Sequence, residues 1–346
     1  MDEQRKEIKG LKPYEPVLLK TKYKLDANEN TYDIPREVKR KIIKAAGKTA
    51  FNRYPDPLCR DLKKALAKKM KLTPEYIAVG NGSDELISCL MQSFVSEGDR
   101  VAIPVPSFEV YEITAKIAGA AAVKVPLTEN FDLDEKMMLR EAAKKRTKLT
   151  VLGYPNNPTG NCFSRRKIER MISAARGIVV VDEAYFEFCG KTFSDMVKKN
   201  RNVVVLRTFS KAFSMAGLRV GYMAAPPEIV SVVNKVRMPY NINSISQKAA
   251  VIALENTELM QDSIYKIIKE RERMAGLIKE KYKTAGSDAN FILVKVRNAA
   301  KAKKLFEKHS ISVRTFSFPA LKGYIRITVG KPAENRAVMK ILEKGI

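Results

Sequence analysis

Seven short runs of apolar, mostly β-branched residues recur along the chain, and segments with helical spacing separate them. The runs are residues 77–79, 101–103, 123–125, 149–152, 178–181, 203–206 and 220–224. Runs of this kind are typical of strands that are buried on both faces of a mostly parallel sheet. Because helical segments alternate with them, the sequence predicts an α/β fold in which helices flank one large sheet.

The segments on either side of these runs predict three parts. A helix is expected from Pro35, with Val38, Ile42 and Ile43 on its apolar face. Beyond residue 242 the pattern changes to long amphipathic helices and two further strand-like runs. We therefore expect an N-terminal arm (1–34), a large domain with the sheet (35–242) and a smaller α+β domain (243–346).

The charge of the chain is strongly positive, with 64 basic and 38 acidic residues among 346 and a net charge of +26. The basic residues come in short groups at helical spacing, as on solvated helix faces. No zinc-finger or aromatic RNA-binding signature accompanies them, so we expect small anionic substrates and no nucleic-acid partner. No apolar run is long enough to span a membrane, and the N-terminus is charged, so a cytoplasmic protein is expected.

The residues that usually bind metals are sparse. Cys59, Cys89, Cys162 and Cys189 lie far apart in the sequence, which favours reduced thiols over a disulfide framework or a zinc site. The single histidine, His309, lies in a polar C-terminal stretch. We therefore expect no metal, and a lysine or a carboxylate as the group that transfers protons.

Lys211 lies in a segment that follows a predicted buried strand and also carries Thr208, Ser210 and Arg219. Apolar surroundings lower the pKa of a lysine and leave its amine able to attack an aldehyde. The two hydroxyls are suited to hold a phosphate, together with the rigid fork of donors on Arg219. A helix start with a surface lysine is the alternative interpretation of this segment.

Asp182 ends another predicted strand, where a buried carboxylate is costly unless a cation compensates it. A protonated pyridine nitrogen is such a cation, and this pairing makes the ring an electron sink. Tyr185 adds a phenol that can reach a ring hydroxyl. A helix cap or a pair with an arginine is the structural alternative for Asp182.

Three more segments follow predicted strands and offer groups to a ligand. Asn157 lies in a rigid turn with two prolines and a glycine. The glycine turn at Gly82 and Ser83 enters a helix, whose free N–H groups favour a bound phosphate. Phe108 is placed to stack on a planar ring. Each is common by itself, as a turn, a glycine before a helix or a core aromatic.

Together, these segments resemble the fold type I pyridoxal-phosphate aminotransferases over nearly the whole chain, and most closely the histidinol-phosphate aminotransferases. The shared order is glycine turn, stacking aromatic, Asn-Pro-Thr-Gly, Asp-x-x-Tyr, Ser-Lys and arginine. The arm also matches, in residues 11–16 and 25–30, as does the segment 53–57. Two departures are Thr31, where the family commonly has proline, and Phe108, where a tyrosine is more usual; both keep the physical role.

The resemblance implies pyridoxal 5'-phosphate as the cofactor, with Lys211 as the lysine that binds it through a Schiff base. Asp182 is implied as the partner of the pyridinium, and Phe108 as the stacking ring. Asn157 and Tyr185 are implied as ligands of the ring oxygen. The other cofactor-binding residues that it implies are Gly82, Ser83, Asp84, Thr208, Ser210 and Arg219.

The resemblance also implies a homodimer and a set of substrate-binding residues. Tyr54 matches a tyrosine that reaches the cofactor phosphate of the partner subunit. Arg326 matches an arginine that forks a substrate carboxylate, and Arg314 matches one that meets a substrate phosphate; Tyr14 and Asn28 complete the substrate-binding set. We expect the two arginines at opposite ends of the site, where they would suit dianionic substrates.

The implied reaction moves an amino group between histidinol phosphate, whose oxo partner is imidazole acetol phosphate, and the glutamate/2-oxoglutarate pair of histidine biosynthesis. Lys211 would be both anchor and general base, with ping-pong kinetics. A threonine-phosphate decarboxylase or an aromatic amino-acid aminotransferase would share the same site, because reaction choice depends on the substrate pocket. From another class, a regulator with this fold would be expected to lose Lys211 or Asp182, and both are present.

Overall fold

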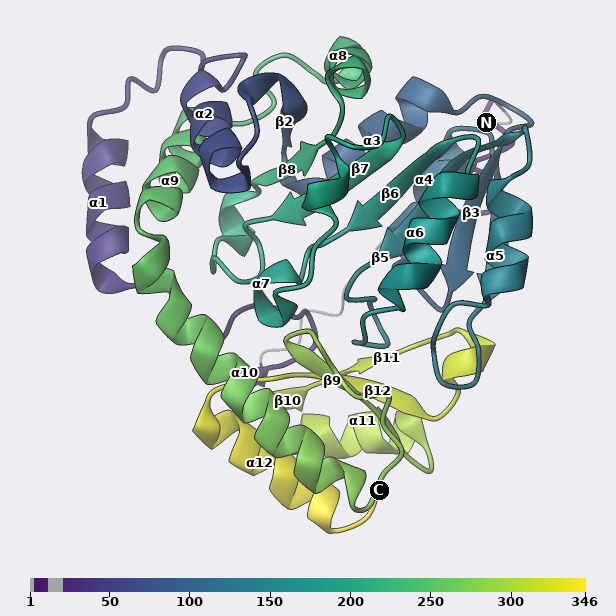
Figure 1. Cartoon of the computed structure of the whole chain (residues 1–346). Helices are drawn as coiled ribbons and strands as arrows, with labels where there is room; N and C mark the ends of the chain where they lie inside the picture. Colours follow the sequence, from purple (N-terminus) through teal and green to yellow (C-terminus); the bar gives the residue numbers. More distant parts are fainter. Residues whose placement is uncertain (1–2, 12–20) are drawn as a thin grey trace.

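The computed structural model describes residues 3–11 and 21–346, and its largest element is a seven-stranded sheet with the order β2-β8-β7-β6-β5-β3-β4 (Figure 1). The strands are β2 (Ile77–Gly80), β3 (Arg100–Val105), β4 (Ala121–Pro126), β5 (Thr147–Gly153), β6 (Ile178–Asp182), β7 (Val203–Thr208) and β8 (Gly221–Ala224). Each of the seven predicted runs forms one of these strands, so the prediction of the large sheet is confirmed.

The sheet is mostly parallel, as predicted. The five strands β4, β3, β5, β6 and β7 are neighbours in this order and pair in parallel, whereas β8 is antiparallel to both β2 and β7. Both faces are buried: Val180 and Val204 join the core on one face, and Val179 and Val205 join the core on the other. Because side chains alternate between the faces of a strand, this burial accounts for the continuous apolar runs in the sequence.

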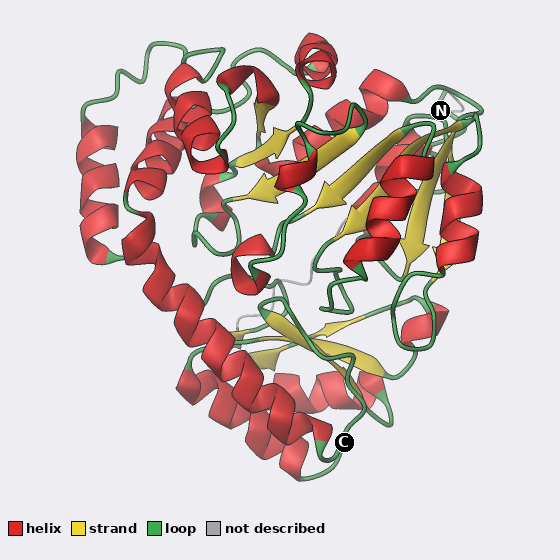
Figure 2. Cartoon of the chain, viewed as in Figure 1, coloured by secondary structure: helices red, strands yellow, loops and turns green. Residues whose placement is uncertain are grey.

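Helices cover both faces of the sheet (Figure 2). Residues of α3, α4 and α8 pack into one core, and residues of α2, α6 and α9 pack into the other. The helices in this stretch are α1 (Arg36–Gly47), α2 (Arg60–Met70), α3 (Gly82–Phe94), α4 (Glu109–Ile117), α5 (Glu135–Ala142), α6 (Arg165–Ala174), α7 (Phe186–Cys189), α8 (Pro227–Val236) and α9 (Ser244–Glu255). The predicted α/β fold class is therefore confirmed.

A second, smaller layer of strands lies beside the carboxyl ends of the parallel strands (Figure 1). Its antiparallel sheet has the order β11-β12-β9, and a parallel pair joins β1 to β10. The elements are β1 (Tyr23–Lys24), β9 (Phe291–Lys295), β10 (Ile311–Ser312), β11 (Arg314–Thr315), β12 (Tyr324–Thr328), α10 (Thr257–Lys279), α11 (Ala299–Lys308) and α12 (Pro332–Glu343). In the described part of the chain, none of the helices combines the length and the apolarity of a membrane span.

The division into an arm and two domains stays a prediction, and the structure adds two facts that bear on it. Helix α9 begins just after the predicted boundary at residue 242, yet it packs against α1 and α2. Tyr14, predicted to bind substrate, lies outside the described residues.

The prediction for one face of α1 is wrong. Val38 is fully buried and Ile42 packs against the core, but Ile43 is 62% exposed. Adjacent helical residues point about 100° apart, so Ile42 and Ile43 are both buried only when the packed face of the helix is wide. Helix α1 packs chiefly against α9, and that contact covers only one side of the helix.

Candidate active site

A cavity of about 490 Å³ lies where the carboxyl ends of the parallel strands face the small antiparallel sheet. This is the edge at which open α/β sheets bind their ligands. Segments far apart in the sequence meet there. The predicted site residues that line the cavity are Asn28, Ser83, Asp84, Phe108, Asn157, Asp182, Tyr185, Thr208, Ser210, Lys211, Arg219, Arg314 and Arg326.

Lys211 follows β7 and extends its amine into this cavity. Its Nζ donates a hydrogen bond to the carbonyl oxygen of Ala27 at 3.0 Å. Burial lowers the pKa of Lys211 to about 8, and the positive charge of Arg326 adds to the effect. An amine with so low a pKa is partly uncharged near neutral pH, so it is able to act as a nucleophile or a base.

Asp182 is the last residue of β6 and is 5% exposed. Its Oδ2 accepts a hydrogen bond from the Tyr111 hydroxyl at 2.7 Å, and its Oδ1 accepts one from the backbone N–H of Ala184 at 3.0 Å. Burial raises the pKa of Asp182 to about 6, although both hydrogen bonds oppose that rise. Neither donor is a cation, so a cationic group bound in the cavity would stabilise the carboxylate.

Tyr111 is a residue of this site that the sequence interpretation missed. It lies on α4, is 2% exposed and lines the cavity. Its ring meets the ring of Phe108 edge to face, with centroids 5.6 Å apart and an interplanar angle of 89°. Tyr111 thus contacts both the predicted stacking ring and the predicted partner of the pyridinium. In the sequence it looks like one more apolar position of an amphipathic helix.

The start of α3 and the loop after β7 form one polar end of the cavity. Arg219 donates from Nη1 to the Ser210 hydroxyl and from Nη2 to the Asp84 carboxylate, each at 3.0 Å. Thr208 and Ser210 are linked through their hydroxyls, also at 3.0 Å. A helix start, two hydroxyls and a guanidinium are the groups that bind a phosphate.

Gly82 is required at this end of the cavity for its lack of a side chain. Its φ of 76° lies in the left-handed region, and a Cβ at this position would collide with the guanidinium of Arg219. Gly82 itself is absent from the cavity lining, but its N–H donates to the carbonyl oxygen of Arg219 at 3.1 Å. Its role is therefore to let the helix start and Arg219 come together.

Asn157, Tyr185 and Asn28 lie together on another wall of the cavity. The Asn28 amide donates to the Tyr185 hydroxyl at 2.9 Å. Arg326 donates from Nη1 to the Asn157 side-chain oxygen at 2.6 Å, and from Nη2 to the Asp26 carbonyl oxygen at 2.6 Å. These contacts join the arm, the Asn157 turn and β12 around one space.

Arg314 and Arg326 are closer neighbours than the sequence suggested. They lie opposite each other on the antiparallel strands β11 and β12, so they share one face of that sheet, and both line the cavity. The expectation that they lie at opposite ends of the site is wrong, because the chain reverses between the two strands. Their two charges form one cationic wall.

Tyr54 does not line this cavity. It is 81% exposed, and its ring stacks on Tyr240 with centroids 4.4 Å apart. Its predicted contact with the site of a second subunit stays a prediction.

Two of the cysteines are neighbours in space, which their sequence positions did not reveal. The interaction between the Cys162 and Cys189 thiols raises the pKa of Cys162 and lowers that of Cys189. All four cysteines are free thiols. Within the described residues, no group of histidine, cysteine and acidic side chains has the arrangement of a metal site.

The cavity fits the predicted cofactor on three independent observations. The amine of Lys211 has a lowered pKa, which suits a bond to an aldehyde. Asp182 is a buried carboxylate whose two described donors are uncharged, which suits a pyridinium. Ser210 and Arg219 adjoin the start of α3, and this arrangement suits a phosphate.

Comparison with known proteins gives a consistent result. The family model described as aminotransferase class I and II matches residues 20–342. The histidinol-phosphate aminotransferase of Thermoanaerobacter pseudethanolicus is 44% identical over 337 residues, which cover 96% of this chain and 95% of that protein. The enzyme of the same name from Thermococcus gammatolerans is 40% identical, with 97% and 96% covered.

The fold agrees with these sequence matches. The crystal structure of histidinol-phosphate aminotransferase from Sinorhizobium meliloti, in complex with pyridoxal-5'-phosphate, aligns with a TM-score of 0.90 at 25% identity. The alignment covers 99% of this chain and 98% of that chain. The chain therefore belongs to the aminotransferase class I and II family, among the histidinol-phosphate aminotransferases.

Proposed function

We propose that this protein uses pyridoxal 5'-phosphate to transfer an amino group between histidinol phosphate, whose oxo partner is imidazole acetol phosphate, and the glutamate/2-oxoglutarate pair of histidine biosynthesis. The observation that carries this proposal is the cavity in which Lys211, Asp182 and a phosphate-binding helix start converge beside two arginines. The full-length similarity to histidinol-phosphate aminotransferases supports the choice of substrate.

We assign the cofactor to this cavity as follows. When bound, pyridoxal phosphate supplies a ring that accepts the electrons released at the substrate carbon. Lys211 holds the aldehyde carbon covalently, Asp182 pairs with the ring nitrogen and Phe108 stacks on the ring. The groups assigned to the ring oxygen and the phosphate are Asn157, Tyr185, Ser83, Asp84, Thr208, Ser210 and Arg219.

Lys211 is also the group that moves the proton. Once the substrate amine has displaced Lys211 from the aldehyde carbon, the Nζ of Lys211 would be free to accept the proton of the substrate carbon. It would then deliver this proton to the former aldehyde carbon of the cofactor. A lysine of ordinary pKa would stay protonated at neutral pH and be a poor base. The lowered pKa of Lys211 brings it into the range in which general bases work.

The cationic wall of Arg314 and Arg326 accounts for the two different substrates. Histidinol phosphate carries a phosphate, and glutamate carries two carboxylates. In a ping-pong reaction these substrates occupy the site one after the other. Adjacent guanidinium groups bind either kind of anion through forked hydrogen bonds, so one wall serves both half-reactions.

We also propose that the protein acts as a homodimer in the cytoplasm. A group of large apolar side chains is exposed on the part of the surface formed by α1, the loop after it and the segment before α9. Its members are Ile43, Phe51, Tyr54, Leu58, Met238 and Tyr240. If a second copy of the chain covers this group, Tyr54 of the first copy would lie near the cofactor site of the second copy, as the predicted role of this tyrosine requires.

The experiment that tests the reaction is a panel of amine donors offered to the cofactor-loaded protein with 2-oxoglutarate. Histidinol phosphate, threonine phosphate, phenylalanine and tyrosine are compared at equal concentration, and both glutamate and carbon dioxide are measured. We expect glutamate formation to be fastest with histidinol phosphate, without release of carbon dioxide. Carbon dioxide from threonine phosphate, or a faster aromatic donor, would contradict the proposed reaction.

A further inference from the structure

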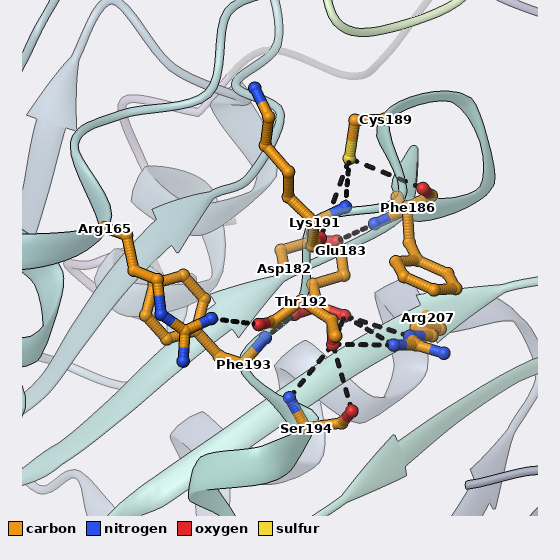
Figure 3. A network of polar contacts seen from close by, with 11 residues as sticks. Arg165, Asp182, Glu183, Phe186, Cys189, Lys191, Thr192, Phe193, Ser194 and Arg207 are labelled. Carbon is orange, nitrogen blue, oxygen red and sulfur yellow. Dashed lines mark hydrogen bonds and ion pairs between the residues drawn. The ribbon is translucent and has the colours of Figure 1, made fainter.

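A buried ion pair, Glu183 with Arg207, lies beside the cavity without lining it (Figure 3). Glu183 is 0% exposed and Arg207 is 4% exposed. Arg207 donates to Oε2 of Glu183 twice, from Nε at 3.0 Å and from Nη2 at 2.9 Å. Both charges are thus taken out of water and held in one fixed geometry.

Other groups complete this pair from three directions. The Thr192 hydroxyl donates to Oε2 of Glu183 at 2.9 Å and accepts from Nη2 of Arg207 at 2.8 Å. The backbone N–H of Phe193 donates to the other oxygen of Glu183. The guanidinium of Arg207 lies over the Phe186 ring, 3.6 Å from its centroid. The pair is therefore fully enclosed by its neighbours.

Glu183 directly follows β6, and Arg207 lies on β7, the parallel neighbour of β6. Glu183 comes directly after Asp182, and its N–H donates to the Leu206 carbonyl oxygen at 2.8 Å. Arg207 comes directly before Thr208. Because side chains alternate along a strand, Asp182 and Thr208 point away from the pair, and both line the cavity.

Stability alone is a weak reason for such a pair. Desolvation of two charges offsets most of their attraction, and well-packed apolar residues of similar volume often serve a fold as well. An ion pair differs from apolar packing in direction, since a forked hydrogen bond fixes both the distance and the angle between the groups that it joins.

We propose that Glu183 and Arg207 are positioning residues, which hold the segment 182–185 at a fixed separation from the segment 208–211. The first segment supplies the groups for the ring nitrogen and ring oxygen, and the second supplies the lysine and part of the phosphate site. A rigid cofactor needs both sets at one spacing. The inference rests on the proposed cofactor site and adds a reason for its geometry.

The test compares Glu183→Gln and Arg207→Lys with a matched control, Glu141→Gln. Glu141 is also buried and accepts from the Arg100 guanidinium at 2.6 Å, but this pair joins β3 to α5 and is absent from the cavity lining. The dissociation constant of pyridoxal phosphate is measured at a temperature at which circular dichroism shows every variant folded. We expect it to rise at least tenfold in the two test variants and to change less than twofold in the control.

Thr192→Val supplies a milder variant in case the buried substitutions prevent folding. It removes the hydroxyl that bridges Glu183 and Arg207 and that also accepts from the Ser194 N–H, and Thr192 is not in the cavity lining. We expect a loss of cofactor affinity of about threefold and a shift in the pH midpoint of the bound cofactor's visible absorption, because Asp182 moves relative to the ring.

Two outcomes would overturn the positioning role. One is an unchanged dissociation constant and absorption midpoint in the folded variants, and the other is a loss of affinity in Glu141→Gln as large as in Glu183→Gln. Both leave the proposed function intact, since the unaltered protein is assayed separately with histidinol phosphate. Failure of that assay with normal cofactor binding would contradict the reaction and leave the positioning role standing.

Discussion

At the scale of single residues, burial prepares the cavity for a ligand that is both an aldehyde and a cation. It lowers the pKa of Lys211 to about 8 and raises that of Asp182 to about 6. Near pH 7 the lysine is thus partly an amine, and the aspartate is mostly a carboxylate in need of a counter-charge. The two opposite shifts have the same main cause, burial, and they suit the aldehyde and the ring nitrogen of the proposed cofactor.

The lowered pKa of Lys211 predicts how fast the cofactor-free protein captures pyridoxal phosphate. Below the pKa the amine is protonated and unable to attack the aldehyde, so the rate is expected to rise with pH through a midpoint of about 8. Stopped-flow absorbance between pH 6 and pH 10 measures this rate, and Lys211→Ala reports the background from other lysines. A midpoint near the ordinary lysine value of 10.5 would contradict the effect of burial.

Tyr111→Phe tests the hydrogen bond to Asp182. The change leaves the ring packing in place but removes a donor that stabilises the carboxylate, so cofactor affinity is expected to fall on the order of tenfold, as for one hydrogen bond to a charged group. Equilibrium dialysis of pyridoxal phosphate measures the loss. Tyr282→Phe is the control, because its hydroxyl donates at the same 2.7 Å to the Leu342 carbonyl oxygen, away from the cavity. Equal affinities in both variants would refute the role of Tyr111.

The site residues at the carboxyl ends of apolar strands were predictable from the sequence. The residues that belong to the site only through a tertiary contact were not. Lys211, Asp182 and Asn157 each follow an apolar strand, and parallel strands bring their carboxyl ends together. The hydrogen bond of Tyr111 has no such signature. Glu183 likewise looks like one more polar residue after a strand, because its partner Arg207 lies on a different strand.

At the scale of elements, the turn between β2 and α3 and the loop after β7 together build the polar end of the cavity, to which we assign the cofactor phosphate. Gly82→Ala is expected to weaken pyridoxal phosphate binding at least tenfold, because the added Cβ displaces Arg219 from its place beside Ser210. The left-handed backbone adds a strain of about 1–2 kcal/mol to the folded state.

Gly286→Ala separates these two effects of Gly82→Ala. Gly286 has a φ of 75°, nearly that of Gly82, but a Cβ there would meet no atom within 4 Å. Thermal unfolding should therefore show a similar loss of stability in both proteins, and titration with pyridoxal phosphate should show weak binding only in Gly82→Ala. Comparable affinities in the two variants would show that the collision with Arg219 is unimportant.

The elements themselves were predictable to different degrees. Most of the seven strands were predicted because they are buried on two faces and therefore carry apolar runs, whereas the edge strand β4 is partly exposed and its run contains Lys124. The short strands β10 and β11, of two residues each, carry no such pattern. This is why the cross-strand position of Arg314 beside Arg326 became visible only in the structure.

At the scale of the whole molecule, the exposed apolar group around Tyr54 is expected to be covered by a second copy. Light scattering during gel filtration should give twice the 38.9 kDa mass of one chain. Phe51→Asp places a charge in this group, since Phe51 is 79% exposed in the single chain, and it should shift the mass toward that of one chain. Transamination should fall with dimer content, because Tyr54 then leaves its neighbour's site. A single-chain mass for the unaltered protein would contradict the homodimer.

The central claim, that Lys211 carries the cofactor in this cavity, is tested most directly by reduction with borohydride. The cofactor-loaded protein is reduced and digested, and the peptides are mapped by mass spectrometry. The account predicts that the peptide containing Lys211 carries the reduced pyridoxyl phosphate in near-stoichiometric amount. The corresponding peptide of the Lys211→Ala protein should carry none. An unmodified Lys211, or an adduct at a different lysine, would contradict it.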